Sequence, residues 1–111
     1  MNPNVIDETV LRELEATTGE EFAAELIETF LQEAPGMLEG LKSAAGAGDG
    51  ESFRRAAHSI KSNANTFGLR ALAEVARGLE TRGLESGASL LDALDAEYAR
   101  AASALRERLN G

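Results

Sequence analysis

Apolar residues recur along this chain at spacings of three and four, a repeat that predicts amphipathic helices and no strands. The most regular stretch lies between residues 49 and 68, where Asp49 can cap a helix start and Gly68 can end it in a left-handed conformation. Its apolar positions follow intervals of four, three, four and three: Phe53, Ala57, Ile60, Ala64 and Phe67. We expect these five side chains to face the core.

The same repeat predicts four further helices. They cover about Asp7–Ala16, with Asp7 as the cap, a long segment that begins near residue 18, then about Leu69–Arg82 and about Ala88–Leu109. The last helix carries Tyr98 in its apolar stripe, so we expect Tyr98 in the core.

Local signals in the sequence bear on the start, the middle and the end of the long helix. The run Thr18-Gly19-Glu20-Glu21 fits a capping box at its start. Pro35 removes a backbone donor and should kink the helix or restart it; the apolar stripe keeps its phase across Pro35, which favours a kink. Residues 44–50 are small and rich in glycine and predict a turn. The expected apolar face comprises Phe22, Leu26, Phe30, Ala34, Leu38 and Leu41, and is broadened by Ile27, Leu31 and Met37.

Short turns between amphipathic helices imply antiparallel neighbours. We therefore predict an all-α fold, an antiparallel up-down four-helix bundle with a short additional N-terminal helix that covers one end. With 111 residues, 43% of them hydrophobic, residues 1–111 suit a single domain with one modest core.

Composition excludes several kinds of chemistry. The chain has no cysteine and one histidine, too few ligands for a zinc site. It has no glycine-rich nucleotide loop, so we expect no kinase activity of its own. No apolar run approaches the ~18 residues of a membrane span. The first ten residues lack the basic and apolar regions of a signal peptide, so we expect a cytoplasmic protein.

The net charge of −8 argues against nucleic acid and anionic membranes as partners. The charge is unevenly placed: residues 1–50 carry −9, residues 51–70 carry +3 and residues 71–111 carry −2. The only basic segment of this acidic chain is therefore the one that contains the single histidine, His58. This arrangement favours a site for an anion.

His58 lies about 140° from the middle of its helix's apolar stripe, on the face expected to meet solvent. Arg54 precedes it by four residues, Lys61 and Ser62 follow it by three and four, and Asn65 follows by seven, so all share that face. An imidazole is partly neutral at physiological pH and can act as a nucleophile. A transferring phosphoryl group needs donors around its oxygens, and Arg54, Lys61 and Ser62 could supply them. Asn65 could hold a phosphoryl oxygen or the second ring nitrogen.

The residues from His58 to Gly68, HSIKSNANTFG, also resemble the signature of histidine-containing phosphotransfer (HPt) domains. That signature has a histidine, any residue, a hydrophobic residue, a lysine and small residues, with a hydrophobic-glycine pair ending ten residues after the histidine. The similarity continues into Leu72, Ala73, Leu79 and Glu80, and length and helix order agree over nearly the whole chain.

The resemblance implies a phosphorelay intermediate. His58 would accept a phosphoryl group from a phospho-aspartate on a response-regulator receiver domain and pass it reversibly to another receiver. The receivers would belong to a hybrid histidine kinase and a downstream regulator. They would also supply Mg²⁺, so the chain would need no cofactor of its own, and a self-contained bundle is expected to be a monomer.

Two other interpretations remain open. The bundle could be a non-catalytic module that docks a receiver or a kinase, or a structural bundle whose surface histidine has no role. Incubation with a phosphorylated receiver separates the three, because only the first predicts label on His58.

Overall fold

The computed structural model describes residues 5–110, all of whose regular structure is helical. As the periodicity predicts, this part of the chain forms five α-helices; it also contains one short 3₁₀ turn that the pattern did not indicate. In chain order they are α1 (Glu8–Thr18), α2 (Glu20–Ala47), α3 (Gly50–Thr66), α4 (Arg70–Arg82), η1 (Gly83–Glu85) and α5 (Ala88–Asn110).

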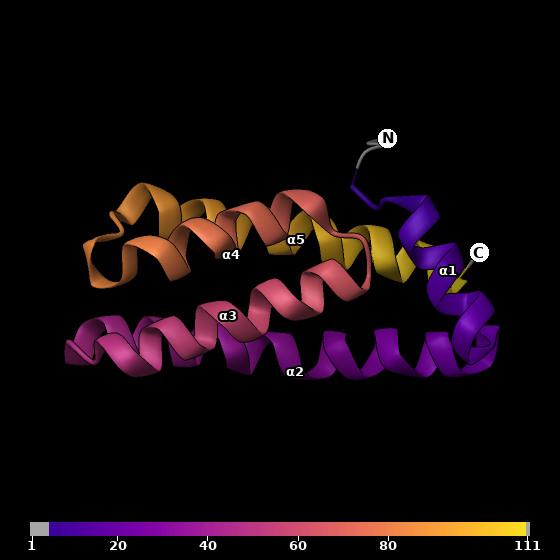
Figure 1. Ribbon diagram of the computed structural model, residues 1–111, viewed down its shortest axis with the longest axis horizontal. Coiled ribbons are helices and arrows are strands. Elements are labelled where there is room, and N and C mark those ends of the chain that lie inside the picture. The colour runs from indigo at the N-terminus through magenta and orange to yellow at the C-terminus, as the bar shows by residue number, and fades with distance from the viewer. Residues whose placement is uncertain (1–4, 111) are drawn as a thin grey trace.

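Helices α2 to α5 form the predicted antiparallel up-down bundle (Figure 1), and the structure as a whole measures 41 × 25 × 20 Å along its principal axes. Helix α3 packs between α2 and α4, and α5 packs against α4 and α2, which closes the bundle. The short α1 lies across one end, beside the start of α2 and the end of α5 (Figure 1). None of the helices in residues 5–110 is both long and apolar enough to span a membrane.

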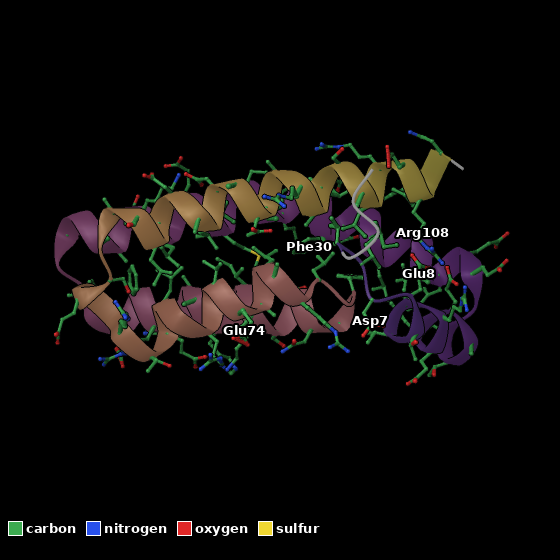
Figure 2. The ribbon with its side chains drawn as sticks, turned by 90° about the horizontal axis from the view of Figure 1, so that it is seen from above. Asp7, Glu8, Phe30, Glu74 and Arg108 are labelled. Carbon is green, nitrogen blue, oxygen red and sulfur yellow. The ribbon has the colours of Figure 1, made fainter. Side chains whose placement is uncertain are left out.

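The apolar stripe of α3 is buried as its spacing predicts. Phe53, Ala57, Ile60, Ala64 and Phe67 are each at most 3% exposed. The Phe67 ring lies 5.3 Å from the ring of Phe30, measured between centroids. Figure 2 shows Phe30 pointing into the space between the helices. Because the stripe is buried, the opposite face of α3, which carries His58, is turned towards solvent.

Tyr98 joins this aromatic cluster from α5, with its ring edge-on to Phe30 at 6.2 Å. The side chain is half-buried, and burial raises the pKa of its hydroxyl. The prediction that Tyr98 packs in the core is therefore confirmed.

The expected apolar face of α2 is wrong at its first position. Phe22 is 50% exposed, whereas its neighbour Ala23 is fully buried. The buried row on α2 follows Ala23, Ile27 and Phe30, one position on from Phe22. At this end of α2 the packing partner is the short α1, and the small side chain of Ala23 faces the bundle there.

The capping box at residues 18–21 does not form. Thr18 is the last residue of α1, and its hydroxyl donates to the Leu14 carbonyl at 2.8 Å instead of capping α2. Gly19 stands between the two helices with φ +91°, a conformation that glycine adopts without strain. The chain therefore reverses through one glycine, which leaves no room for a separate cap residue.

Helix α2 continues through Pro35 without interruption, so a restart at this proline is wrong (Figure 1). It also extends to Ala47, which places most of the expected turn at residues 44–50 inside the helix. Gly48, with φ +70°, ends the helix, and the Asp49 amide donates to the Ala44 carbonyl at 2.9 Å. Alanine is the best helix former, so a small-residue run continues a helix until a left-handed glycine ends it.

The limits of α3 match the prediction. The Asp49 carboxylate accepts a hydrogen bond from the Ser52 amide at 3.1 Å, and Gly68 is left-handed with φ +72°. The Leu69 amide donates back to the Ala64 carbonyl at 2.8 Å and closes the turn. This turn sends α4 back along α3 and sets which residues of the two helices face each other.

The N-terminal helix covers the bundle end as expected. The Asp7 amide donates to the Gly68 carbonyl at 2.7 Å, and the Asp7 side chain accepts from the Thr9 amide as the cap of α1. At the other side, Arg108 of α5 reaches Glu8 of α1 at 2.6 Å (Figure 2). These contacts join α1 to the α3–α4 turn and to α5.

Candidate functional site

His58 lies in the middle of α3 with 61% of its side chain exposed. The residues on either side of it in the apolar stripe, Ala57 and Ile60, are buried. The helix phase read from the sequence is therefore correct at His58, whose imidazole is accessible to a partner.

The carboxylate of Glu80, on the facing helix α4, contacts two residues of the site at once. Its Oε2 lies 2.9 Å from Nδ1 of His58, and its Oε1 lies 2.6 Å from Nζ of Lys61. His58 and Lys61 are one helical turn apart on α3, so a single carboxylate from α4 spans both.

These contacts decide which ring nitrogen of His58 is free. The Lys61 hydrogen bond, together with the one from His58, holds the pKa of Glu80 below its usual value. An ionised carboxylate only accepts hydrogen bonds, so Nδ1 of His58 must carry the proton that it donates to Glu80. In the neutral ring, Nε2 then has a free lone pair, and it is the nitrogen that can attack an electrophile.

The predicted cations have different surroundings. Lys61 is half-buried and paired with Glu80, as described above. Arg54 is exposed, and together with His58 and Glu80 it lines one shallow hollow at the start of α3. Arg55 lines the same hollow and pairs with Glu51 at 3.2 Å. The structure thus brings Arg54 and Lys61 to opposite sides of His58 along the helix.

Ser62 is exposed one turn after His58, and its small side chain leaves that side of the imidazole open. Asn65 does not join the site: it lines a separate hollow with Gly68 and Arg70, about 10 Å further along α3. The expectation that Asn65 could hold the second ring nitrogen is wrong, because Glu80 binds that nitrogen.

Sequence reasoning placed Glu80 within the family resemblance but gave it no role. A signal for its position exists in the α3–α4 hairpin. His58 precedes Gly68 by ten residues and Glu80 follows it by twelve, so an antiparallel pair that turns at Gly68 brings them nearly opposite each other. A carboxylate at that position was therefore a candidate partner for the imidazole.

In the part of the chain that the structure describes, no cluster of three histidine or carboxylate side chains could hold a metal ion. The arrangement instead joins an exposed nucleophilic nitrogen, a carboxylate that fixes the ring and two cations nearby. This combination suits the capture of an anionic electrophile such as a phosphoryl group.

Comparisons with known proteins agree with this geometry. A family model described as Hpt domain matches residues 25–104. The chain is similar to the crystal structure of histidine-containing phosphotransfer protein B (HptB) from Pseudomonas aeruginosa PAO1, with 25% identity, a TM-score of 0.90 and coverage of 98% of this chain and 97% of that chain. It also shares its fold with the HPT domain of an Hpt sensor hybrid histidine kinase from Shewanella, at 15% identity, a TM-score of 0.80 and the same coverage. A search of curated proteins found no match.

Proposed function

The chain belongs to the Hpt domain family and is a histidine phosphotransfer protein of phosphorelay signalling, and from this premise we propose that His58 is the residue that carries the phosphoryl group. The observation that carries the proposal is the hydrogen bond from His58 Nδ1 to Glu80, which leaves an exposed Nε2 as the nucleophile. His58 is also the only histidine in the chain.

The transfer step follows from this geometry. Nε2 attacks the phosphorus of an aspartyl phosphate on a receiver domain, a N–P bond forms, and the P–O bond to the aspartate breaks with its electron pair leaving on the carboxylate. The proton on Nδ1 stays in place, so the phosphorylated ring carries a positive charge that the Glu80 carboxylate stabilises. The same proton makes the imidazole a neutral leaving group in the reverse step, which suits reversible transfer.

The neighbouring side chains have separate tasks in this proposal. Arg54 faces the phosphoryl oxygens from the start of α3, and Lys61 holds Glu80 and adds positive charge on the other side of His58. Ser62 offers a hydroxyl and, because it is small, lets the partner approach. The chain supplies a nucleophile and a cationic frame, and the transition state needs both.

The partners that this chemistry requires are receiver domains, since Hpt domains act with receiver domains of hybrid kinases. We propose a hybrid histidine kinase as donor and a downstream regulator as acceptor, with Mg²⁺ bound by the receiver. We further propose that residues 1–111 act as one domain, as a monomer in the cytoplasm.

The experiment is incubation of the purified chain with a ³²P-phosphorylated receiver domain in the presence of Mg²⁺. Label should appear on the chain, be lost in acid and survive base, as a phosphoramidate does, and be absent from His58→Gln. Stable docking without label on the wild-type chain would instead favour a non-catalytic docking module. Label that persists in His58→Gln would place the acceptor elsewhere.

A further inference from the structure

The basic side chains around His58 differ in whether a carboxylate already neutralises them. Lys61 pairs with Glu80 at 2.6 Å and Arg55 pairs with Glu51 at 3.2 Å. Arg54 forms no ion pair with any residue between 5 and 110. The guanidinium of Arg54 is therefore the positive charge of this site that is free to meet an incoming anion.

The guanidinium of Arg54 rests against the backbone of Gly83, the first residue of η1. A Cβ atom placed on Gly83 would lie 2.9 Å from Nη2, 3.0 Å from Nε and 3.2 Å from Cζ of Arg54. Three guanidinium atoms of Arg54 are thus nearly equidistant from the site of a Cβ at residue 83. The guanidinium therefore covers the space that a side chain on residue 83 would fill. Gly83 itself is buried, and only glycine leaves this space open.

Gly83 also has a positive φ, and this conformation is independent of its contact with Arg54. Its φ of +58° favours glycine whatever surrounds it. Gly19, with φ +91°, also has a positive angle, but a Cβ there would meet nothing within 4 Å. The chain therefore offers one positive-φ glycine where an added Cβ would meet Arg54, and another where an added Cβ would meet no other atom within 4 Å.

We propose that Gly83 is a positioning residue for phosphotransfer that acts through Arg54. This inference rests on the proposed function of His58. The bare Cα of Gly83 lets the guanidinium lie on the η1 turn, beside the hollow that Arg54 shares with His58 and Glu80. An arginine side chain held in advance loses less rotamer freedom when it meets the phosphoryl oxygens. A methyl group at residue 83 would displace the guanidinium and remove this preorganisation.

The test is a double-mutant cycle on the single-turnover rate of transfer from a phosphorylated receiver, at a temperature where circular dichroism shows every variant folded. Gly83→Ala and Arg54→Ala should each slow transfer several-fold. The double variant should be no slower than Arg54→Ala alone, because Gly83 has no effect once the guanidinium is gone. Additive losses would show that Gly83 acts independently of Arg54 and would overturn the inference.

Gly19→Ala is the matched control, because it introduces a side chain at a positive φ far from the site. It should lower the melting temperature but leave the transfer rate unchanged. If it slows transfer as much as Gly83→Ala, general destabilisation accounts for both effects and the inference fails.

A second variant tests the contact from the side of the arginine, without any change at Gly83. Arg54→Lys keeps the charge but replaces the planar guanidinium that lies on Gly83. This variant should transfer the phosphoryl group several-fold more slowly than wild type. Transfer at the wild-type rate would overturn the inference. The wild-type chain separates the two proposals: absence of label on its His58 refutes the proposed function, whereas normal labelling with an unimpaired Gly83→Ala refutes only the role of Gly83.

Discussion

Glu80 and His58 are 22 residues apart in the sequence, and their side chains meet at 2.9 Å between Oε2 and Nδ1. The contact joins α3 to α4 across the hairpin that turns at Gly68. It fixes the proton on Nδ1 and leaves Nε2 for chemistry, so the reactivity of an exposed histidine depends on a residue from another helix.

The first prediction concerns the charge of Glu80. Glu80→Gln can still accept a hydrogen bond but cannot offset the positive charge of the phosphorylated imidazole. We expect slower phosphoryl transfer to His58 and faster loss of the phosphoryl group, measured by rapid quench and by the lifetime of the labelled protein. Unchanged rates and lifetime would mean that Glu80 only orients the ring.

The second prediction concerns pH. The pKa of Glu80 in the folded chain is below its usual 4.5, chiefly because of Lys61, so folding favours the ionised form. Its contribution to the free energy of unfolding is therefore fully present above about pH 5 and is lost as the pH falls through the folded-state pKa. Denaturant melts of wild type and Glu80→Gln should differ at pH 7, and the difference should shrink as the pH falls through the folded-state pKa of Glu80.

The matched control for this pH series is Glu28→Gln, since Glu28 is exposed and has no ion pair in residues 5–110. It should leave the free energy of unfolding close to wild type across the range. If the difference in unfolding free energy between Glu80→Gln and wild type stayed constant with pH, this would contradict the lowered pKa of Glu80.

The third prediction compares two neighbours on α3. Lys61→Ala should slow transfer and, because it removes the ion pair with Glu80, should lower the free energy of unfolding, but by far less than a buried charge does. Ala64→Arg should unfold the bundle, because Ala64 is completely buried and an unpaired charge is costly to bury. Thermal melts test both variants, and equal destabilisation would show that the face of α3 has been misassigned.

The fourth prediction concerns the encounter with the receiver. Under the proposed function an anionic aspartyl phosphate approaches His58, and the neighbouring Arg54 has no ion pair among residues 5–110. Arg54→Glu should therefore slow association several-fold at low salt, and the difference from wild type should shrink as salt shortens the Debye length to about 8 Å at physiological ionic strength. Stopped-flow rates over a salt series measure this. Glu28→Lys, an exposed change on α2, serves as the control and should have a much smaller effect.

The fifth prediction tests the corrected face of α2. Phe30 is 3% exposed and contacts two aromatic rings, so Phe30→Ala should cost about 3–5 kcal/mol. Phe22 is half exposed, and Phe22→Ser should stay within about ±0.5 kcal/mol. Urea unfolding of the two variants measures the difference. A comparable loss of unfolding free energy in both would show that Phe22 belongs to the core.

The amino-acid pattern was enough to predict the helices, the buried stripe of α3 and the outward position of His58. A helix repeats every 3.6 residues, so the spacing of apolar residues within one segment states which side is buried, and a single polar residue can be placed relative to it. The basic segment around His58 and the similarity from His58 to Gly68 could also be recognised, since each is a continuous stretch of the sequence.

The contacts between helices did not follow from these patterns. Glu80 contacts His58, and the guanidinium of Arg54 lies against Gly83, only because of the register between elements. No pattern within a single helix contains that register. The exposure of Phe22 and the extension of α2 to Ala47 depend likewise on what packs at the ends of that helix. Local periodicity predicted the exposed position of His58, whereas packing of α4 against α3 brings in the Glu80 carboxylate that orients its ring.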